Sequence, residues 1–401
     1  MRTLTSLLLT LCLAISLSAF AGGQEPATFD QIAKLNAPDG AANDEFGYSV
    51  AISGNVMVVG KENAAVQSAF VYESNSGTVT QVAELTPSDG IAGDRFGFSV
   101  AISGNTIAIA ATEHKNHDPI NTGSVYVYVE PAGGWTDMTE TAELNLGQAG
   151  ASIGRSIGVS GNEVVSINGF SGGSVVVWNE PTAGWVNSSK PNAELLGGDP
   201  NDLQGLLNVA ISGNVIVAGS PQAYSDYGSA FLYVKPARGW NKIGITPTAR
   251  LVGTGPDSGG GLAVAINGNT VASSTGSSVY VFVKPSSGWA NMNETATLTD
   301  ANAFPELDAL SVSGGTVVAG DPGQSVGVNP GQGAAFVFLK PLGGWKNLAT
   351  ANAELTADDG NIGDNLGSSV GVSGGTVVAG APLAAIDSNA AEGAAYVFAA
   401  Q

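Results

Sequence analysis

The chain of 401 residues carries 34 acidic and 14 basic side chains, which gives a formal net charge of −20. A negative field of this size argues against nucleic acid or an anionic membrane surface as a partner, and it favours cations or basic protein surfaces. The single cysteine, Cys12, excludes an internal disulfide, so the hydrophobic core must stabilise the fold without one.

The first 21 residues have the three parts of a signal peptide. Arg2 gives a positive start, an apolar stretch runs from Leu4 to Leu17, and Ala19 and Ala21 form a small-residue cleavage site. This stretch is too short to cross a bilayer and no stop-transfer pattern follows it, which disfavours the alternative of a retained anchor. We expect a mature protein that starts at Gly22 and is secreted, periplasmic or held at the cell surface, with no membrane insertion after cleavage.

A short turn sequence recurs seven times along the mature chain. The central glycines are 50, 57, 52, 55, 46 and 60 residues apart, a spacing that suits one four-stranded propeller blade per repeat. We therefore predict an all-β, seven-bladed β-propeller as a single domain over residues 22–401. The seven turns are Ser53-Gly54-Asn55, Ser103-Gly104-Asn105, Ser160-Gly161-Asn162, Ser212-Gly213-Asn214, Asn267-Gly268-Asn269, Ser313-Gly314-Gly315 and Ser373-Gly374-Gly375.

Each turn joins two short apolar strands, since its glycine supplies the positive φ that a tight hairpin needs. A third strand follows with aromatic residues at every second position, such as Tyr126 and Tyr128, and these rings are expected to pack between blades. The fourth strand carries the pattern Ala-x-Leu. Its seven copies begin at Ala33, Ala83, Ala142, Ala193, Ala249, Ala296 and Ala353.

The first Ala-x-Leu pattern precedes the first hairpin, and none follows the last third strand. The simplest arrangement is circular: Gln31 to Leu35 pairs with the three C-terminal strands and closes the ring, which removes an open sheet edge. A linear solenoid is the alternative, but it leaves both ends of the chain unexplained.

Five links between third and fourth strands read Pro-x-x-Gly-Trp. We expect each tryptophan to cap the outer end of its blade, and the alternative is a box of aromatic residues for a ligand. The tryptophans are Trp135, Trp185, Trp240, Trp289 and Trp345.

The first two repeats contain Phe46-Gly47 and Phe96-Gly97, and the last contains Gly380-Ala381-Pro382. These motifs resemble FG-GAP repeats over essentially the whole mature chain, and the resemblance implies the β-propeller of integrin α-subunit heads and of many bacterial exported proteins. Other pairs are expected at the Phe-Gly position in the middle of the chain: Ile153-Gly154, Gly205-Leu206, Gly260-Gly261 and Glu306-Leu307.

Calcium-binding members of that family carry an Asp-rich loop between the first two strands of a blade. Here this position is the three-residue turn in every repeat, with too few oxygen ligands for calcium. We therefore do not carry the family's metal site over to this chain, and we expect that no cofactor is required.

One face of the propeller should carry the connections that vary in length, among them 111–122, 321–332 and 381–392, and variable loops on a rigid scaffold are where binding sites usually lie. Six aspartates enter the same face in blades one, two and seven, which are neighbours once the ring closes. As a functional site they would bind a cation such as Ca²⁺ weakly or dock a basic partner. The alternative is that each organises its own turn. The residues are Asp39, Asp44, Asp89, Asp94, Asp359 and Asp364.

His114 and His117 are the two histidines of the chain and lie in the loop of blade two. Two imidazoles three residues apart can share a metal ion, and a solvated loop is the alternative. With no further histidine and no cysteine in the mature chain, Ser-His and Cys-His catalysis is disfavoured.

These features predict a monomeric, non-catalytic binding or adhesion scaffold for an unknown protein or glycan ligand at the cell surface. One rival is a glycan hydrolase that uses two carboxylates across a pocket, and another is a purely structural envelope or matrix protein.

Overall fold

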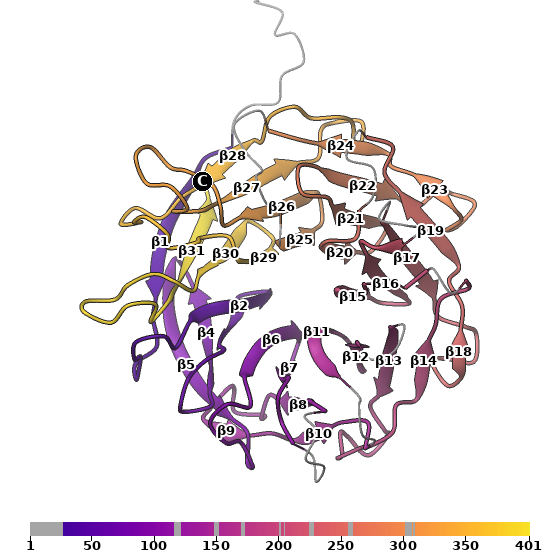
Figure 1. The fold of residues 1–401 in the computed structure, drawn as a ribbon, viewed down its shortest axis with the longest axis horizontal. Helices are drawn as coiled ribbons and strands as arrows, with labels where there is room; N and C mark the ends of the chain where they lie inside the picture. The colour runs from indigo at the N-terminus through magenta and orange to yellow at the C-terminus, as the bar shows by residue number, and fades with distance from the viewer. Residues whose placement is uncertain are drawn as a thin grey trace, which may run out of the picture.

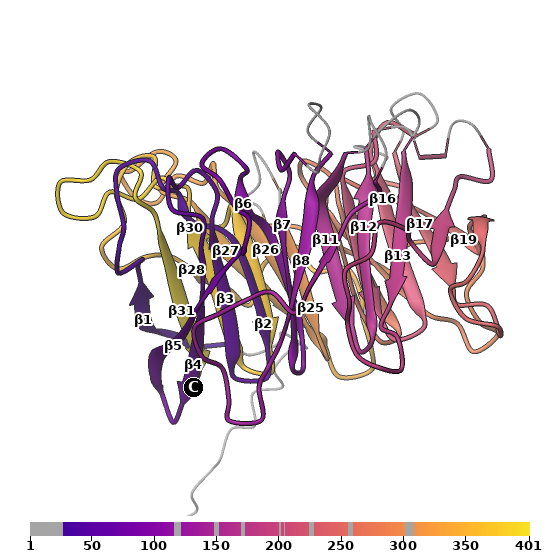
Figure 2. The same ribbon diagram turned by 90° about the horizontal axis from the view of Figure 1, so that it is seen from below.

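The computed structural model describes residues 27–115, 122–147, 152–169, 173–199, 202–203, 205–223, 228–255, 260–300, 307 and 309–401. Seven sheets, each built on an antiparallel blade of four strands, stand around a central axis (Figure 1), and their strands run between the two faces of the ring (Figure 2). The prediction of an all-β, seven-bladed propeller is confirmed. The proposed signal peptide lies outside the described residues.

The innermost strands line the central channel with small and branched apolar side chains. They are β2 (Phe46–Ser53), β6 (Phe96–Ser103), β11 (Ile153–Ser160), β15 (Asn208–Ser212), β20 (Val264–Asn267), β25 (Ala309–Ser313) and β29 (Ser369–Ser373). The second strands are β3 (Val56–Lys61), β7 (Thr106–Ala111), β12 (Glu163–Asn168), β16 (Val215–Ser220), β21 (Thr270–Ser274), β26 (Thr316–Asp321) and β30 (Thr376–Ala381).

The outer half of each blade follows the predicted order. The third strands are β4 (Ala69–Asn75), β8 (Ser124–Val129), β13 (Ser174–Asn179), β17 (Ser229–Val234), β22 (Val279–Val283), β27 (Ala334–Leu339) and β31 (Ala394–Ala400). The fourth strands are β5 (Thr78–Thr86), β10 (Ala142–Leu144), β14 (Ala193–Leu195), β19 (Ala249–Val252), β24 (Ala296–Leu298), β28 (Ala353–Leu355) and, for blade seven, β1 (Phe29–Leu35).

The N-terminal strand closes the ring. Strand β1 pairs antiparallel with β31, with Lys34 opposite Tyr396 and Leu35 opposite Ala395. The last blade therefore has the order β1-β31-β30-β29. The two ends of the chain share one sheet, as predicted, because β31 would otherwise expose an unpaired edge.

The aromatic residues of the third strands pack between blades, as expected. Phe70 and Tyr72 of blade one lie in one buried cluster with Val397 of blade seven. Tyr126 and Tyr128 of blade two contact the apolar side chains of blade one in the same way. Burial against the preceding blade makes each interface part of one continuous hydrophobic core.

The tryptophans of the five links are also buried between blades, so they are core residues and do not cap the outer ends. Trp135, for example, belongs to the cluster between blades one and two. The links run along the outer strand of the preceding blade, where three of them form short parallel strands: β9 (Met138–Thr139) beside β5, β18 (Ile243–Ile245) beside β14, and β23 (Met292–Asn293) beside β19.

The seven tight turns form a ring of hydrogen bonds that the sequence analysis did not anticipate. Each turn glycine, at a φ of 55–62°, donates its N–H to the side chain that opens the turn of the preceding blade. Gly54 donates to Ser373 at 3.0 Å and completes the circle. The other bonds run from Gly104 to Ser53, Gly161 to Ser103, Gly213 to Ser160, Gly268 to Ser212, Gly314 to Asn267 and Gly374 to Ser313.

The glycines of the Phe-Gly and Gly-Ala-Pro motifs meet across a blade interface. A Cβ on Gly380 of blade seven would overlap the carbonyl oxygen of Gly47 in blade one, and the same holds for Gly60 against Gly97. Gly47 also has a φ of 88°, which disfavours any other residue there. The motif therefore lets two backbones approach closely.

Two of the pairs assigned to the Phe-Gly position are wrong by one residue. Leu206 and Leu307 lie in buried interface clusters, as Phe46 does, and the N–H of Leu207 bonds to Gly219 as the N–H of Gly367 bonds to Gly380. The equivalent pair in blade four is therefore Leu206-Leu207. The apolar residue takes the first position because it must reach the core between blades.

Candidate functional site

The six predicted aspartates fall into two groups. Asp44, Asp94 and Asp364 are buried, and each accepts a hydrogen bond from a backbone N–H three residues earlier: from Ala41 at 3.1 Å, from Ile91 at 2.9 Å and from Asn361 at 2.7 Å. These bonds are those expected of aspartates that organise their own turns. Their role as ligand-binding residues stays a prediction.

The other three aspartates are more exposed, and a cationic or polar partner contacts each of them. Asp39 accepts two hydrogen bonds from the ammonium group of Lys61, at 2.9 and 2.8 Å. Asp359 accepts hydrogen bonds from Lys34 at 2.6 Å and from the hydroxyl of Tyr396 at 2.9 Å. The acidic loops of blades one and seven are thus partly neutralised from within the propeller.

In blade two, Asp89 accepts a hydrogen bond from the hydroxyl of Tyr126 at 2.8 Å and lies 3.5 Å from Nε2 of His114. His114 is buried, with its Nδ1 2.9 Å from Asp94, so it is not part of a solvated loop. His117 lies outside the described residues.

In blade one the buried ammonium group of Lys61 offsets the repulsion between the carboxylates of Asp39 and Asp44. The Lys61 side chain is 1% exposed, and its ammonium group lies 2.8 Å from Asp39 and 3.6 Å from Asp44. In blade seven no lysine stands at that place, since Ala381 is the equivalent residue. Burial there raises the pKa of Asp364, and backbone hydrogen bonding and the charge of Lys34 only partly offset it.

A cavity of about 480 Å³ opens at the mouth of the channel, on the face of the long loops. Its walls include Glu45 and Tyr48 of blade one, Phe98 of blade two, Arg155 of blade three and Asn365 of blade seven. The rings of Tyr48 and Phe98 lie 5.3 Å apart. This pocket was not predicted from the sequence, although an aromatic residue directly after Phe-Gly, on the channel side of the first strand, was a usable signal.

The pocket lining mixes apolar side chains with the charged groups of Glu45 and Arg155, and Arg95 packs against Phe98 outside this lining. The guanidinium of Arg95 lies 4.8 Å from the ring of Phe98 and forms an ion pair with the buried carboxylate of Glu62. Burial raises the pKa of Glu45, and the charge of Arg95 opposes this shift. Such a wall offers stacking surface together with a few hydrogen-bonding groups, as ligand pockets commonly do.

Three residues around this mouth have a backbone conformation that non-glycine residues rarely adopt. Glu45, Arg95 and Asn365 occupy equivalent positions before the Phe-Gly site, with φ values of 58°, 59° and 60°. Left-handed backbone at non-glycine residues costs free energy and tends to occur at functional sites. These three residues belong to blades one, two and seven, the blades that also carry the six predicted aspartates.

Comparison with known families supports the repeat assignment. The family model described as FG-GAP repeat matches residues 29–72, 79–128 and 350–398, which are parts of blades one, two, six and seven together with the closing strand. These segments are FG-GAP repeats.

No curated protein matches this chain. Among solved structures, the computationally designed Ika8 protein is similar to it, with 16% sequence identity over 92% of this chain and 99% of that chain and a TM-score of 0.49. In the part of the chain that the structure describes, no helix is long and apolar enough to cross a membrane.

Proposed function

We propose that this protein is an exported, non-catalytic binding or adhesion scaffold whose ligand contacts the loop face around blades seven, one and two. The observation that carries the proposal is the mouth pocket, to which blades seven, one and two contribute Asn365, Glu45 and Phe98. Glu45 and Asn365 have left-handed backbone. Tyr48 and Phe98 would stack against an apolar face of the ligand. Glu45 and Arg155 would bind its polar groups.

The ligand class that fits this wall is a glycan or a short peptide segment of a cell-surface protein. Among the described residues that line the pocket, Glu45 is the one carboxylate, whereas hydrolysis of a glycoside by paired carboxylates needs two. This favours binding over the hydrolase reading. The more exposed Asp39, Asp89 and Asp359 would add attraction for a basic partner, a contribution that salt should weaken.

The test is a binding screen of the mature chain against defined extracellular glycans and against basic and neutral peptides. The Tyr48→Ala, Phe98→Ala double variant should lose at least tenfold in affinity for any ligand found, because both stacking surfaces are removed. The control is Asn105→Ala with Asn214→Ala in the turns of the opposite face, which should bind as the parent does.

A ligand whose affinity falls only in the opposite-face control would refute the assignment of the functional face. Release of sugar from a bound glycan would instead support the hydrolase. Replacing Asp39, Asp89 and Asp359 by asparagine should flatten the salt dependence of binding to a basic peptide. An unchanged salt dependence would show that the acidic loops do not contribute to binding.

A further inference from the structure

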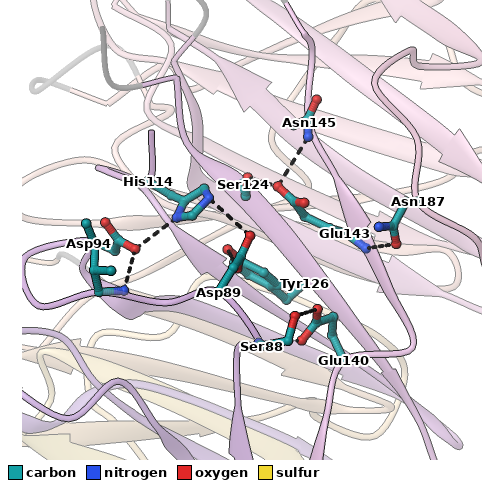
Figure 3. A network of polar contacts seen from close by, with 11 residues as sticks. Ser88, Asp89, Asp94, His114, Ser124, Tyr126, Glu140, Glu143, Asn145 and Asn187 are labelled. Atoms are coloured by element: carbon teal, nitrogen blue, oxygen red, sulfur yellow. Dashed lines mark hydrogen bonds and ion pairs between the residues drawn. The ribbon is translucent and has the colours of Figure 1, made fainter. Parts of the chain in front are cut away.

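The polar network of blade two holds an imidazole nitrogen toward two carboxylates (Figure 3). Asp94 is buried and accepts from the backbone N–H of Ile91, and its second contact is Nδ1 of His114 at 2.9 Å. A carboxylate can only accept a hydrogen bond, so Nδ1 carries the proton. With a metal ion bound, Nε2 would present its lone pair to that ion on the other side of the ring.

Two carboxylates face this lone pair. One oxygen of Asp89, one ring nitrogen of His114 and one oxygen of Glu143 all lie within 4.8 Å of one another. Each acidic group is held from behind: the Tyr126 hydroxyl donates to Asp89 at 2.8 Å, and the Ser124 hydroxyl donates to Glu143 at 2.7 Å. Figure 3 shows these partners arranged around the group.

In blades one and seven a lysine lies against the equivalent aspartates, and it comes from a different strand in each blade. In blade one the ammonium group of Lys61 lies between Asp39 and Asp44, the equivalents of Asp89 and Asp94. In blade seven the middle residue of the Ala-x-Leu pattern is Lys34, which pairs with Asp359.

Blade two has neither lysine. Ala111 replaces Lys61, and Glu143 stands in the place of Lys34 and adds a further negative charge. Within the described residues, no Lys or Arg forms an ion pair with Asp89, Asp94 or Glu143. The carboxylates of Asp89, Asp94 and Glu143 therefore have the imidazole of His114 as their one nearby basic group among the described residues.

We propose that Asp89, His114 and Glu143 bind a divalent transition metal ion, with Zn²⁺ as the best match. Imidazole together with carboxylate oxygens suits zinc, and an imidazole ligand disfavours Ca²⁺ and Mg²⁺. Two ligands about 2.1 Å from one ion at a tetrahedral angle are about 3.4 Å apart, close to the 3.5 Å between His114 and Asp89.

Asp94 completes the arrangement, since a carboxylate on the far nitrogen of a metal-bound histidine fixes the ring and its tautomer. The site has three protein ligands and opens through Asp89, whose side chain is 48% exposed. A fourth position is left for water or for an oxygen of a bound partner. It belongs to the loop face, away from the turns where the calcium loops of the family would lie.

The test is titration of the untagged mature chain with Zn²⁺, followed by calorimetry. We expect one equivalent to bind, and we expect Glu143→Gln, Asp89→Asn and His114→Gln each to weaken binding at least tenfold. Glu84→Gln is the matched control, because Glu84 is the middle residue of the Ala-x-Leu pattern in blade one. His117→Gln tests the other histidine, and both controls should retain the parent affinity.

A second readout separates loss of ligands from loss of fold. Circular dichroism melting should show that Glu143→Gln and Asp89→Asn are folded, and X-ray absorption of the zinc complex should report one imidazole with oxygen ligands. The proposal would be overturned if Glu143→Gln and Glu84→Gln bound Zn²⁺ with equal affinity. It would also be overturned if the parent bound no Zn²⁺ at 0.1 mM, a concentration of about 10⁻⁴ M that is far above the dissociation constants of structural zinc sites. Loss of binding in His117→Gln with retention in Glu143→Gln would also overturn it.

Discussion

The side-chain oxygen of Ser373 accepts the backbone N–H of Gly54 at 3.0 Å, although the two residues are 319 positions apart. This bond joins the last turn of the ring to the first. It is the same bond that joins every other pair of neighbouring turns, so the recurring serine is explained by contact between blades. The asparagine at position 267 can replace it because its Oδ1 accepts in the same way.

Replacing Ser373 by alanine should lower the free energy of unfolding by about 0.5–1.5 kcal/mol, near the lower end because the turn is exposed. Urea denaturation followed by circular dichroism measures this. Ser286→Ala, at an exposed serine of a Pro-x-x-Gly-Trp link, is the control and should stay within about 0.5 kcal/mol of the parent. Equal effects of the two changes would mean that the ring of bonds contributes nothing.

Deleting residues 22–37 should destabilise the whole propeller, because β1 is the outer strand of blade seven and its loss exposes the edge of β31. The melting temperature should fall markedly, and a synthetic peptide of residues 27–37 should restore part of the loss. A scrambled peptide of the same composition is the control. An unchanged melting temperature after deletion would contradict closure by this strand.

Gly380→Ala should cost about 1–3 kcal/mol through overpacking, because the added methyl group meets the backbone of Gly47 in the next blade. Gly133→Ala provides the comparison, since a Cβ there meets no atom within 4 Å. Thermal unfolding of both variants measures the difference. If Gly380→Ala and Gly133→Ala have the same melting temperature, the two blades are not in close backbone contact at this point.

Asp359 and Asp364 should affect the pH dependence of stability in opposite directions. Burial acts to raise the pKa of Asp359, but hydrogen bonds from Lys34 and Tyr396 and the charge of Lys34 outweigh it and lower the pKa below its ordinary value. The stability that Asp359 contributes is therefore present above the carboxyl range and is lost as the pH falls through it. The pKa of Asp364 is raised by burial, so its contribution is present at low pH and is lost as the pH rises.

Unfolding free energies between pH 3 and 7 for the parent and for Asp359→Asn and Asp364→Asn measure these contributions. The difference between the parent and Asp359→Asn should shrink as the pH falls below about 4, the ordinary pKa of an aspartate. The stabilisation that Asp364 gives the parent relative to Asp364→Asn should instead be greatest at low pH and should decrease as the pH rises. Parallel curves for the two variants would contradict the opposite shifts.

Local patterns in the sequence were enough to predict the blades and their closure. Alternating aromatic residues such as Tyr126 and Tyr128, the repeated turns, and the unmatched Ala33-x-Leu35 each depend on strand periodicity or on a count of strands, and both can be read along the chain. The sequence also offered the alternative that each buried aspartate organises its own turn, because the hydrogen-bond partners are only three residues away.

Contacts between residues distant in sequence were decided only by the tertiary structure. Glu45, Phe98, Arg155 and Asn365 line one pocket because the ring brings four blades to the channel mouth. Asp89, His114 and Glu143 converge because a loop before the blade, a loop within it and its fourth strand meet at one point. No periodicity encodes such a meeting, since it depends on how loops and strands that are distant in sequence are placed in the folded ring.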